Sequence, residues 1–206
     1  MKYYTQILQQ LFPSVLFSTD KKEIYLTFDD GPRPIATPSV LNILRKRNIR
    51  ATFFLVGQNV REYPDFARQI KSEGHQIGNH SYSHANLLFK KKSFVTKEII
   101  QTKEILEATV GEHSPFFRPP YGYFSFSTLN VIKETGLTCV LWSIDSKDFR
   151  AGASAKIERR ITEHTANGDI LLFHDNEITA QTLHTYLPNL LDTLLGEGFI
   201  FNTLPL

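Results

Sequence analysis

Short apolar segments alternate along the chain with longer segments in which apolar residues recur every three or four positions. The short segments are rich in β-branched and aromatic residues and predict buried strands, whereas the longer ones predict amphipathic helices. The expected strands span residues 24–28, 51–56, 76–79, 116–118, 137–142, 170–173 and 199–202. The expected helices span residues 38–47, 60–72, 95–110, 127–134, 154–164 and 180–195. This alternation predicts an α/β fold built around a parallel sheet.

Glycines mark the predicted helix ends, because a left-handed residue is favoured where a helix gives way to a strand. They are Gly74, Gly111, Gly136, Gly168 and Gly196. No linker rich in Pro, Gly or Ser divides the chain, so we expect one domain over residues 1–206. This length is short of the roughly 250 residues of an eight-stranded barrel, which leaves an incomplete barrel or an open sheet. In either case, functional residues should follow the C-terminal ends of the strands.

Composition narrows the class of protein further. Hydrophobic residues make up 41% and charged residues 21% of the chain, as in ordinary globular proteins. With 23 Lys and Arg against 21 Asp and Glu, the net charge of +2 predicts no nucleic-acid partner and no anionic membrane surface. The single cysteine, Cys139, excludes an intrachain disulfide. Polar residues interrupt the first 20 positions, so we expect neither a secretory signal nor a membrane span, and we favour a cytoplasmic location.

Reactive side chains follow several of the predicted strands. Asp29 and Asp30 come directly after the first strand, where a cation or hydrogen bonds must offset the cost of burying two carboxylates; a simple Asp-Gly turn is the alternative. His80 and His84 follow the third strand, and a spacing of four would place them on one side of a helical turn. Two imidazoles and one carboxylate could hold a metal ion and leave positions free for water and substrate. Two surface histidines are the alternative.

Three more segments place polar groups at the same end of the predicted sheet. Arg118 and Tyr121 flank two consecutive prolines, which fix an extended backbone and can aim the Arg118 side chain and the Tyr121 backbone N–H at one point. Asp145 and Asp148 follow the fifth strand, and His174 ends the sixth. Taken alone, the Arg118 segment could be a rigid connection, the Asp145 segment a solvated loop, and His174 a structural histidine. Their shared position at strand C-termini indicates a single site.

In this order, the segments resemble the motifs of the polysaccharide deacetylase family, also known as the NodB-homology domain or carbohydrate esterase family 4. The elements are TFDDG at 27–31, HSYSH at 80–84, RPPY at 118–121, DxxD at 145–148 and LFH at 172–174. The resemblance implies a deformed (β/α)7 barrel, similar to a TIM barrel, with parallel strands. It also implies a metal-dependent hydrolase that removes N-acetyl groups from N-acetylglucosamine-containing glycans, such as peptidoglycan fragments or chitooligosaccharides.

The resemblance assigns the metal ligands and the general base. Asp30, His80 and His84 match the residues that hold the metal, which is implied to be zinc, with cobalt, nickel or manganese as alternatives. Asp29 matches the general base that activates water. The residues alone do not distinguish the two aspartates, because both lie at the same strand end.

The remaining roles also follow from the resemblance. His174 matches the general acid, and Arg118 matches the residue that orients the base. Asp148 matches the carboxylate that orients and charges the acid histidine, although Asp145 is a second candidate. The backbone N–H of Tyr121 is implied to stabilise the oxyanion.

Two features depart from the family. Phe149 stands where the family has Trp, which keeps an apolar wall and removes the indole N–H. The expected lack of a signal or anchor favours an alternative, a hydrolase of a small N-acyl or cyclic amide metabolite or of an O-acetyl ester. A non-catalytic carbohydrate-binding protein is a third hypothesis, which the intact motifs argue against.

Histidines outside the motifs are expected to be structural or solvated: His75, His113, His164 and His184.

Overall fold

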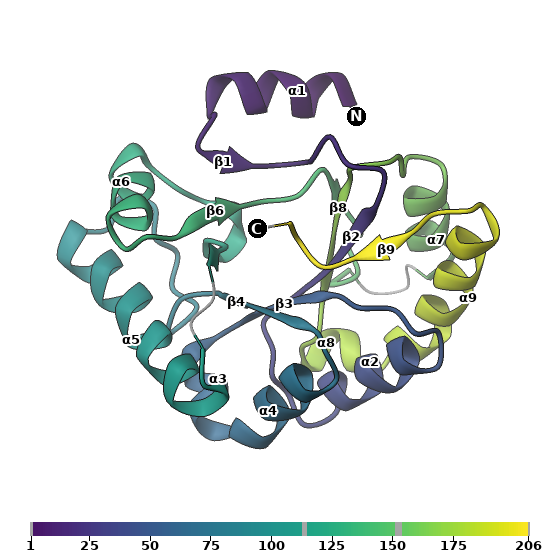
Figure 1. Ribbon diagram of the computed structural model, residues 1–206, viewed down its shortest axis with the longest axis horizontal. Helices are drawn as coiled ribbons and strands as arrows, with labels where there is room; N and C mark the ends of the chain where they lie inside the picture. The colour runs from purple at the N-terminus through teal and green to yellow at the C-terminus, as the bar shows by residue number, and fades with distance from the viewer. Residues whose placement is uncertain (1, 113–114, 151–153, 206) are drawn as a thin grey trace.

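The structure is a computed structural model that describes residues 2–112, 115–150 and 154–205. Its strands are β1 (Val15–Leu16), β2 (Ile24–Asp29), β3 (Thr52–Leu55), β4 (Gln76–Asn79), β5 (Phe116–Phe117), β6 (Thr138–Val140), β7 (Ile144–Asp145), β8 (Ile170–His174) and β9 (Phe201–Asn202). Its helices are α1 (Lys2–Leu11), α2 (Ala36–Arg45), α3 (Gly57–Glu62), α4 (Pro64–Ser72), α5 (Lys92–Val110), α6 (Phe126–Glu134), α7 (Ser154–Thr162), α8 (Glu177–Ala180) and α9 (Leu183–Gly196), with a 3₁₀ turn, η1 (Pro120–Gly122). Figure 1 shows helices around the outside of the strands, with α1 lying across the top.

The strands curl into a distorted barrel. They pair in the order β1-β6-β5-β4-β3-β2-β8-β7, and β9 pairs with the N-terminal half of β2. β6 and β7 lie near opposite ends of this series but belong to one stretch of chain, residues 138–145. The Ser143 N–H within it donates to the Ile170 carbonyl on β8 at 3.0 Å. This stretch therefore closes the series on itself, which confirms the expected α/β fold with parallel strands in a deformed barrel.

β2 contributes to two interiors. Leu26 and Phe28 pack against the surrounding helices, whereas Tyr25 belongs to a separate cluster inside the barrel. Because both faces of a parallel strand are covered, β2 is buried along its whole length. The inward positions become polar towards its C-terminal end, at Thr27 and Asp29. The barrel is thus apolar at the N-terminal ends of its strands and polar at their C-terminal ends.

The first 20 residues contain structure that the hydrophobic pattern did not predict. Here α1 is followed by β1, which extends the sheet by pairing with β6. The Gln9 side chain joins the two elements, because its amide donates to the Val15 carbonyl at 2.8 Å and its oxygen accepts from the Phe17 N–H. Side-chain bonds of this kind leave no trace in hydrophobic periodicity.

Two predicted helices are each divided into two. The helix expected over 60–72 is α3 and α4, because Pro64 lacks the N–H that would continue the first helix. The helix expected over 180–195 begins earlier, at α8, and is interrupted before α9. Gly196 was expected to end this segment but lies inside α9, and Gly198, with φ of 87°, adopts the left-handed conformation instead.

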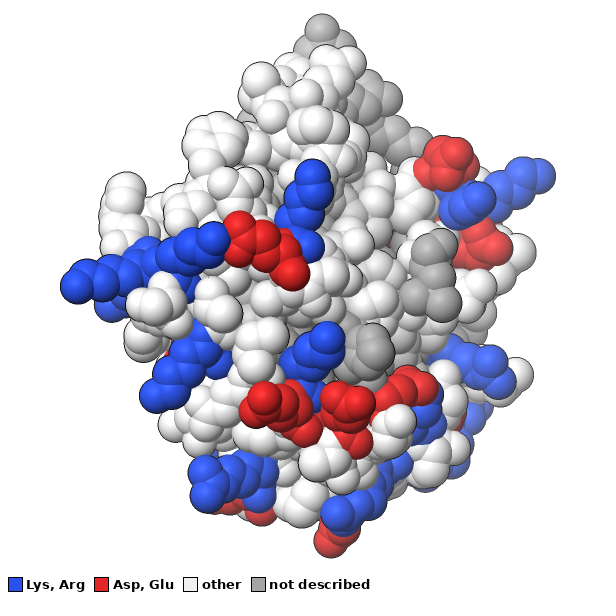
Figure 2. Space-filling model, turned by 60° about the vertical axis from the view of Figure 1, so that its left-hand side comes forward, with Lys and Arg blue, Asp and Glu red and all other residues white. Residues whose placement is uncertain are grey.

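Acidic and basic side chains are mixed on the face shown in Figure 2. Exposed ion pairs also join elements, such as Lys92 on α5 with Glu134 on α6 at 2.7 Å. Within the described ranges, no helix is both long and apolar enough to cross a membrane.

Candidate active site

A cavity of about 510 Å³ opens at the C-terminal ends of the strands. Its polar lining includes Asp29, Asp30, His80, His84 and His174, which come from three separate segments of the chain. Its other lining residues are Tyr121, Tyr123, Trp142, Asp145, Phe149, Leu172, Asn176 and Ile178. The segments that the sequence analysis grouped at one end of the sheet therefore meet in one place.

Asp30, His80 and His84 form a cluster whose ligand atoms lie within 4.8 Å of one another. Asp30 Oδ1 lies 3.0 Å from His84 Nε2 and 3.6 Å from His80 Nε2. His80 Nδ1 is 2.7 Å from the Arg118 carbonyl, so this nitrogen carries the proton and leaves the Nε2 lone pair facing Asp30. Burial opposes ionisation of Asp30, but the two imidazoles hold its pKa well below the usual value. The donor set fits a divalent transition-metal ion.

The loop that carries both histidines is not the helical turn that the spacing predicted. Ser81 and His84 have left-handed backbones, with φ of 65° and 55°. Glu98 on α5 holds the loop: its Oε2 accepts from the N–H groups of Tyr82 at 3.0 Å and Ser83 at 2.8 Å. The two imidazoles converge because this buried carboxylate fixes the turn between them.

Sequence reasoning missed Glu98, although a signal was present. Val95, Ile99, Thr102 and Leu106 form the buried face of α5, and Glu98 lies on the same face. An acidic residue at helical spacing among buried positions needs partners, because an unpaired buried charge is costly. Here, backbone N–H groups of the histidine loop are those partners.

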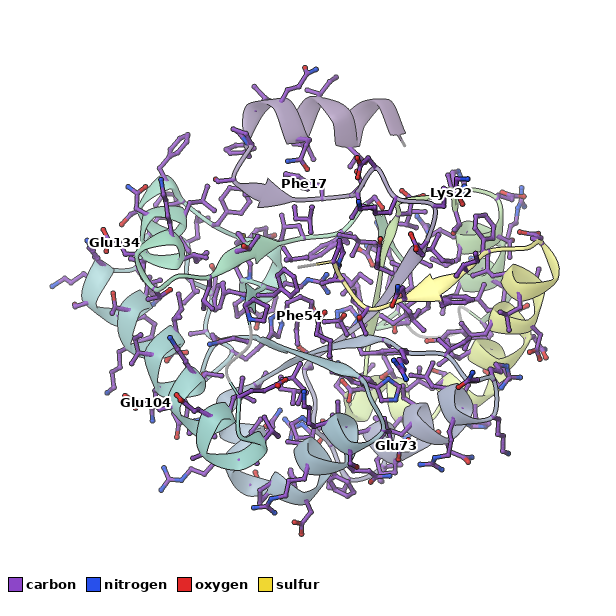
Figure 3. The ribbon with its side chains drawn as sticks, in the orientation of Figure 1. Phe17, Lys22, Phe54, Glu73, Glu104 and Glu134 are labelled. Carbon is purple, nitrogen blue, oxygen red and sulfur yellow. The ribbon has the colours of Figure 1, made fainter. Side chains whose placement is uncertain are left out.

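Arg118 distinguishes the two adjacent aspartates. Its guanidinium is fully buried and donates to Asp29 Oδ1 at 2.7 Å and to the Thr27 hydroxyl at 2.8 Å. It lies 4.0 Å from the centre of the ring of Phe54, which Figure 3 shows in the barrel interior. Burial lowers the pKa of Arg118 and the Asp29 carboxylate opposes this shift. Asp29 Oδ2 lies 3.7 Å from His80 Nε2, facing the candidate metal cluster.

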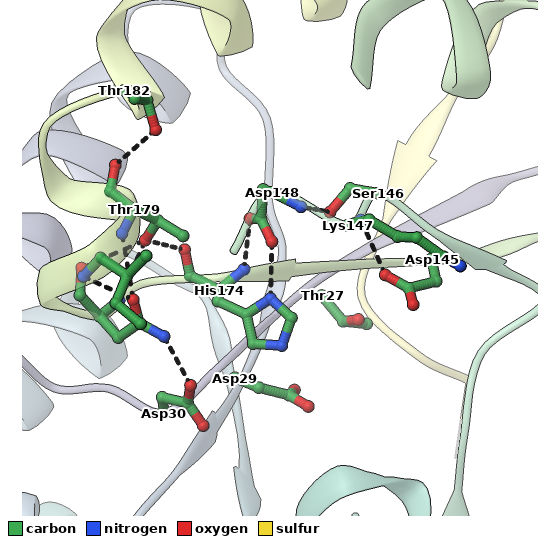
Figure 4. Close-up of polar contacts among 12 residues, drawn as sticks. Thr27, Asp29, Asp30, Asp145, Ser146, Lys147, Asp148, His174, Thr179 and Thr182 are labelled. Carbon is green, nitrogen blue, oxygen red and sulfur yellow. Dashed lines mark hydrogen bonds and ion pairs between the residues drawn. The ribbon is translucent and has the colours of Figure 1, made fainter. Parts of the chain in front are cut away.

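His174 is paired with Asp148 (Figure 4). His174 Nδ1 lies 2.7 Å from Asp148 Oδ1, and the His174 backbone N–H donates to Oδ2 at 2.8 Å. Burial works against the charged imidazole, but the hydrogen bond and charge of Asp148 outweigh it and raise the pKa of His174 to about 9. Asp145, the other candidate, accepts from the Lys147 N–H at 2.8 Å within its own loop. Of the two carboxylates, Asp148 is therefore the one bonded to His174.

Two aromatic residues border the histidines. Tyr121 has a left-handed backbone, with φ of 60°, and its ring packs edge-on against His84 at 4.8 Å. Gly122 follows, also left-handed, and a Cβ there would lie 2.7 Å from the Trp142 ring. Phe149, which stands where the family has Trp, packs edge-on against His174 at 5.6 Å.

Residues that the sequence analysis did not identify hold the Asp30 turn. Asp30 has φ of 80°, its carbonyl accepts from the Asn59 amide at 2.7 Å, and its Oδ2 accepts from the Asn176 amide at 2.7 Å. Asp175 lies fully buried behind the turn, where a Cβ on Gly31 would come within 2.3 Å of its carboxylate. Burial raises the pKa of Asp175 well above its usual value. In the sequence, none of these residues differs from an ordinary cap or turn residue.

The histidines outside the motifs do not reach the cavity in the described part of the chain. His75 is buried and accepts from the Ala51 N–H at 3.1 Å, and burial lowers its pKa to about 4. His164 and His184 are exposed, and His113 lies outside the described residues.

A family model for polysaccharide deacetylases matches residues 18–140, more than half of the chain. The chain belongs to the polysaccharide deacetylase family. A chitooligosaccharide deacetylase from Azorhizobium caulinodans is 40% identical to this chain over 157 residues. The aligned residues cover 76% of this chain and 75% of that protein.

Solved structures of polysaccharide deacetylases share the fold along almost the whole chain. The Bc1960 peptidoglycan N-acetylglucosamine deacetylase superposes with a TM-score of 0.86 at 33% identity, covering 96% of this chain and 94% of that one. BA3943, a family 4 pseudoenzyme from Bacillus anthracis, superposes with a TM-score of 0.85 at 25% identity, covering 96% of this chain and 69% of that one. Because this fold also occurs in a pseudoenzyme, the case for catalysis rests on the side chains of the cavity.

Proposed function

We propose that this polysaccharide deacetylase is a metal-dependent hydrolase that removes N-acetyl groups from N-acetylglucosamine-containing glycans, such as peptidoglycan fragments or chitooligosaccharides. The observation that carries the proposal is the convergence of three groups on one cavity: a metal-ligand cluster, an Arg-bound carboxylate and an Asp-bound imidazole. The activities named for its relatives support the same substrate class.

Asp30, His80 and His84 would hold the metal ion, most favourably Zn²⁺, with Co²⁺, Ni²⁺ or Mn²⁺ as alternatives for the same donors. When bound, the ion supplies Lewis acidity that polarises the acetyl carbonyl and lowers the pKa of water. The His80 ring is already oriented for this task by its bond to the Arg118 carbonyl.

Asp29 is the proposed general base. Arg118 engages Oδ1, while Oδ2 remains available to take a proton from the attacking water. The Tyr121 backbone N–H is proposed to donate to the oxyanion that forms as water adds to the carbonyl. The left-handed backbone at Tyr121 belongs to the turn that borders His84 and the cavity.

His174 is the proposed general acid. Asp148 holds Nδ1, so the Nε2–H is left to donate its proton to the glycan nitrogen as the C–N bond breaks. This proton is required because an amine anion is too basic to leave. The pKa of His174, raised to about 9, keeps the imidazole charged at neutral pH. The products are acetate and a glycan with a free amine.

Aromatic side chains provide a surface for the sugar. Tyr121 is 58% exposed and Tyr123 is 53% exposed, and both line the cavity next to the metal cluster. Aromatic faces pack against the apolar faces of pyranose rings. We propose that these residues, together with Phe149, which also lines the cavity, position the acetylated sugar.

The test is acetate release from N-acetylglucosamine oligomers and from peptidoglycan fragments by the purified full chain. We expect release that is abolished by a chelator, restored by Zn²⁺, and reduced at least about 100-fold in Asp29→Asn, because general-base catalysis contributes this much. No release by protein shown to bind Zn²⁺ would contradict the glycan substrate. Turnover of small amides or O-acetyl esters under the same conditions would identify the alternative class.

A further inference from the structure

We propose that Asn176 is a positioning residue that orients the Asp30 carboxylate so that one oxygen, Oδ1, is presented to the metal ion. The inference rests on the proposed function, since it concerns the metal that the deacetylase site would hold. It assigns a role to a residue that lies outside the sequence elements matching the family motifs.

The orientation of the Asn176 amide is fixed by its own helix. Asn176 is the N-cap of α8, and its side-chain oxygen accepts from the N–H groups of Ile178 at 3.0 Å and Thr179 at 3.1 Å. The Thr179 hydroxyl in turn accepts from the Asn176 backbone N–H. Because the oxygen serves two backbone donors, the amide nitrogen must face the opposite side, where Asp30 lies.

The two oxygens of Asp30 therefore have different environments. Oδ2 accepts from the Asn176 amide at 2.7 Å, whereas Oδ1 faces the Nε2 atoms of His84 and His80. The Asn59 amide holds the backbone carbonyl of the same residue. Asp30 is thus held at both its carbonyl and its carboxylate before any ion arrives.

A carboxylate held in this way would offer a metal ion a single oxygen. This would leave more coordination positions for water and the acetyl carbonyl than a bidentate carboxylate would. It also disfavours Ca²⁺, which takes bidentate carboxylates and many oxygen ligands, relative to transition-metal ions. Partners that orient a metal ligand typically contribute about 10–100-fold to metal affinity.

The test compares two variants with a matched control. Asn176→Ser keeps a capping hydroxyl for α8 but is too short to reach Asp30, and Asn176→Gly keeps a tolerated N-cap residue should the first fail to fold. Ser125→Ala is the control, because Ser125 caps α6 by accepting from the Thr128 N–H and lies outside the cavity lining. The full chain of each is titrated with Zn²⁺ against a chromophoric chelator, and the visible spectrum of its Co²⁺ form is recorded.

We expect the Asn176 variants to bind Zn²⁺ about 10–100-fold more weakly and to show altered Co²⁺ bands, with the control unchanged in both. Neither measurement depends on glycan turnover. Equal affinity and an identical Co²⁺ spectrum in wild type and Asn176→Ser would overturn the inference and leave the proposed function intact. Failure of the wild-type chain to bind Zn²⁺ would overturn both.

Discussion

Single carboxylates set the protonation of the groups around the cavity. Asp148 raises the pKa of His174 to about 9 against the effect of burial. Since the pKa of an unfolded histidine is near 6.5, this pair stabilises the fold fully below that pH and loses its contribution as the pH rises through 9. The protonated imidazole of His174 therefore both stabilises the fold and serves as the proposed proton donor.

We expect Asp148→Asn to lower the pKa of His174, because the charge that offsets desolvation is lost. The alkaline limb of the kcat/KM profile for acetate release should move to lower pH. Activity at pH 8 should fall by about tenfold or more. Asp145→Asn is the control and should leave the limb in place, since Asp145 bonds to its own loop. An unmoved limb in Asp148→Asn would contradict the role of His174 as the acid.

Burial also raises the pKa of Asp175, which forms no ion pair with the described residues. The folded state keeps its proton while the unfolded state releases it above about pH 4, so the wild type loses stability as the pH rises. In metal-free protein, Asp175→Asn should therefore gain unfolding free energy relative to wild type between pH 4 and pH 7. Urea unfolding should show a larger gain in unfolding free energy at pH 7 than at pH 4. A difference independent of pH would show that Asp175 is ionised in the fold.

At the scale of elements, α5 shapes the metal site without lining it. Glu98→Ala removes the acceptor of two backbone N–H groups in the histidine loop, which should lower the unfolding free energy by about 2 kcal/mol or more and weaken Zn²⁺ binding. Glu104→Ala is the matched control, because Glu104 lies on the exposed side of the same helix (Figure 3). Denaturant unfolding and Zn²⁺ competition measure both effects. Equal unfolding free energies and equal Zn²⁺ affinities in the two variants would rule out a role for Glu98 in holding the histidine loop.

The elements also show why part of the site was predictable from sequence and part was not. Strand ends place Asp29 and His174 in register, because parallel pairing aligns residue 29 with residue 174 and apolar runs mark both strands. The left-handed backbone at Ser81 and His84 has no such local signal, since it depends on a helix that follows later in the chain. The predicted helical turn at 80–84 was wrong for this reason. Asn176 and Asn59 act through contacts that only the folded chain creates.

Across the whole molecule, Arg118 joins strands that are far apart in sequence. Its guanidinium donates to Asp29 and Thr27 on β2 and to the Leu141 carbonyl just after β6. Removing one partner of a buried ion pair leaves an uncompensated charge. We therefore expect Arg118→Met to lower the unfolding free energy by about 3–5 kcal/mol.

The comparison for this prediction is an exposed pair. Lys92→Met breaks the ion pair with Glu134 between α5 and α6, and should change the unfolding free energy by about 1 kcal/mol or less. Denaturant unfolding of both variants checks the contrast. Similar losses would mean that Arg118 orients Asp29 without supporting the barrel.

An apolar cluster that includes Tyr25, Phe54 and Ile170 fills the barrel interior beneath the Arg118 guanidinium. The loops at the C-terminal ends of the strands carry the cavity wall, where Trp142 packs against this cluster and the exposed Tyr121 is not part of it. Substitutions at exposed wall positions such as Tyr121 should therefore change the shape of the cavity while the apolar cluster beneath it keeps its packing. The support of Arg118 and Asp29 is then separate from the surface that meets the substrate.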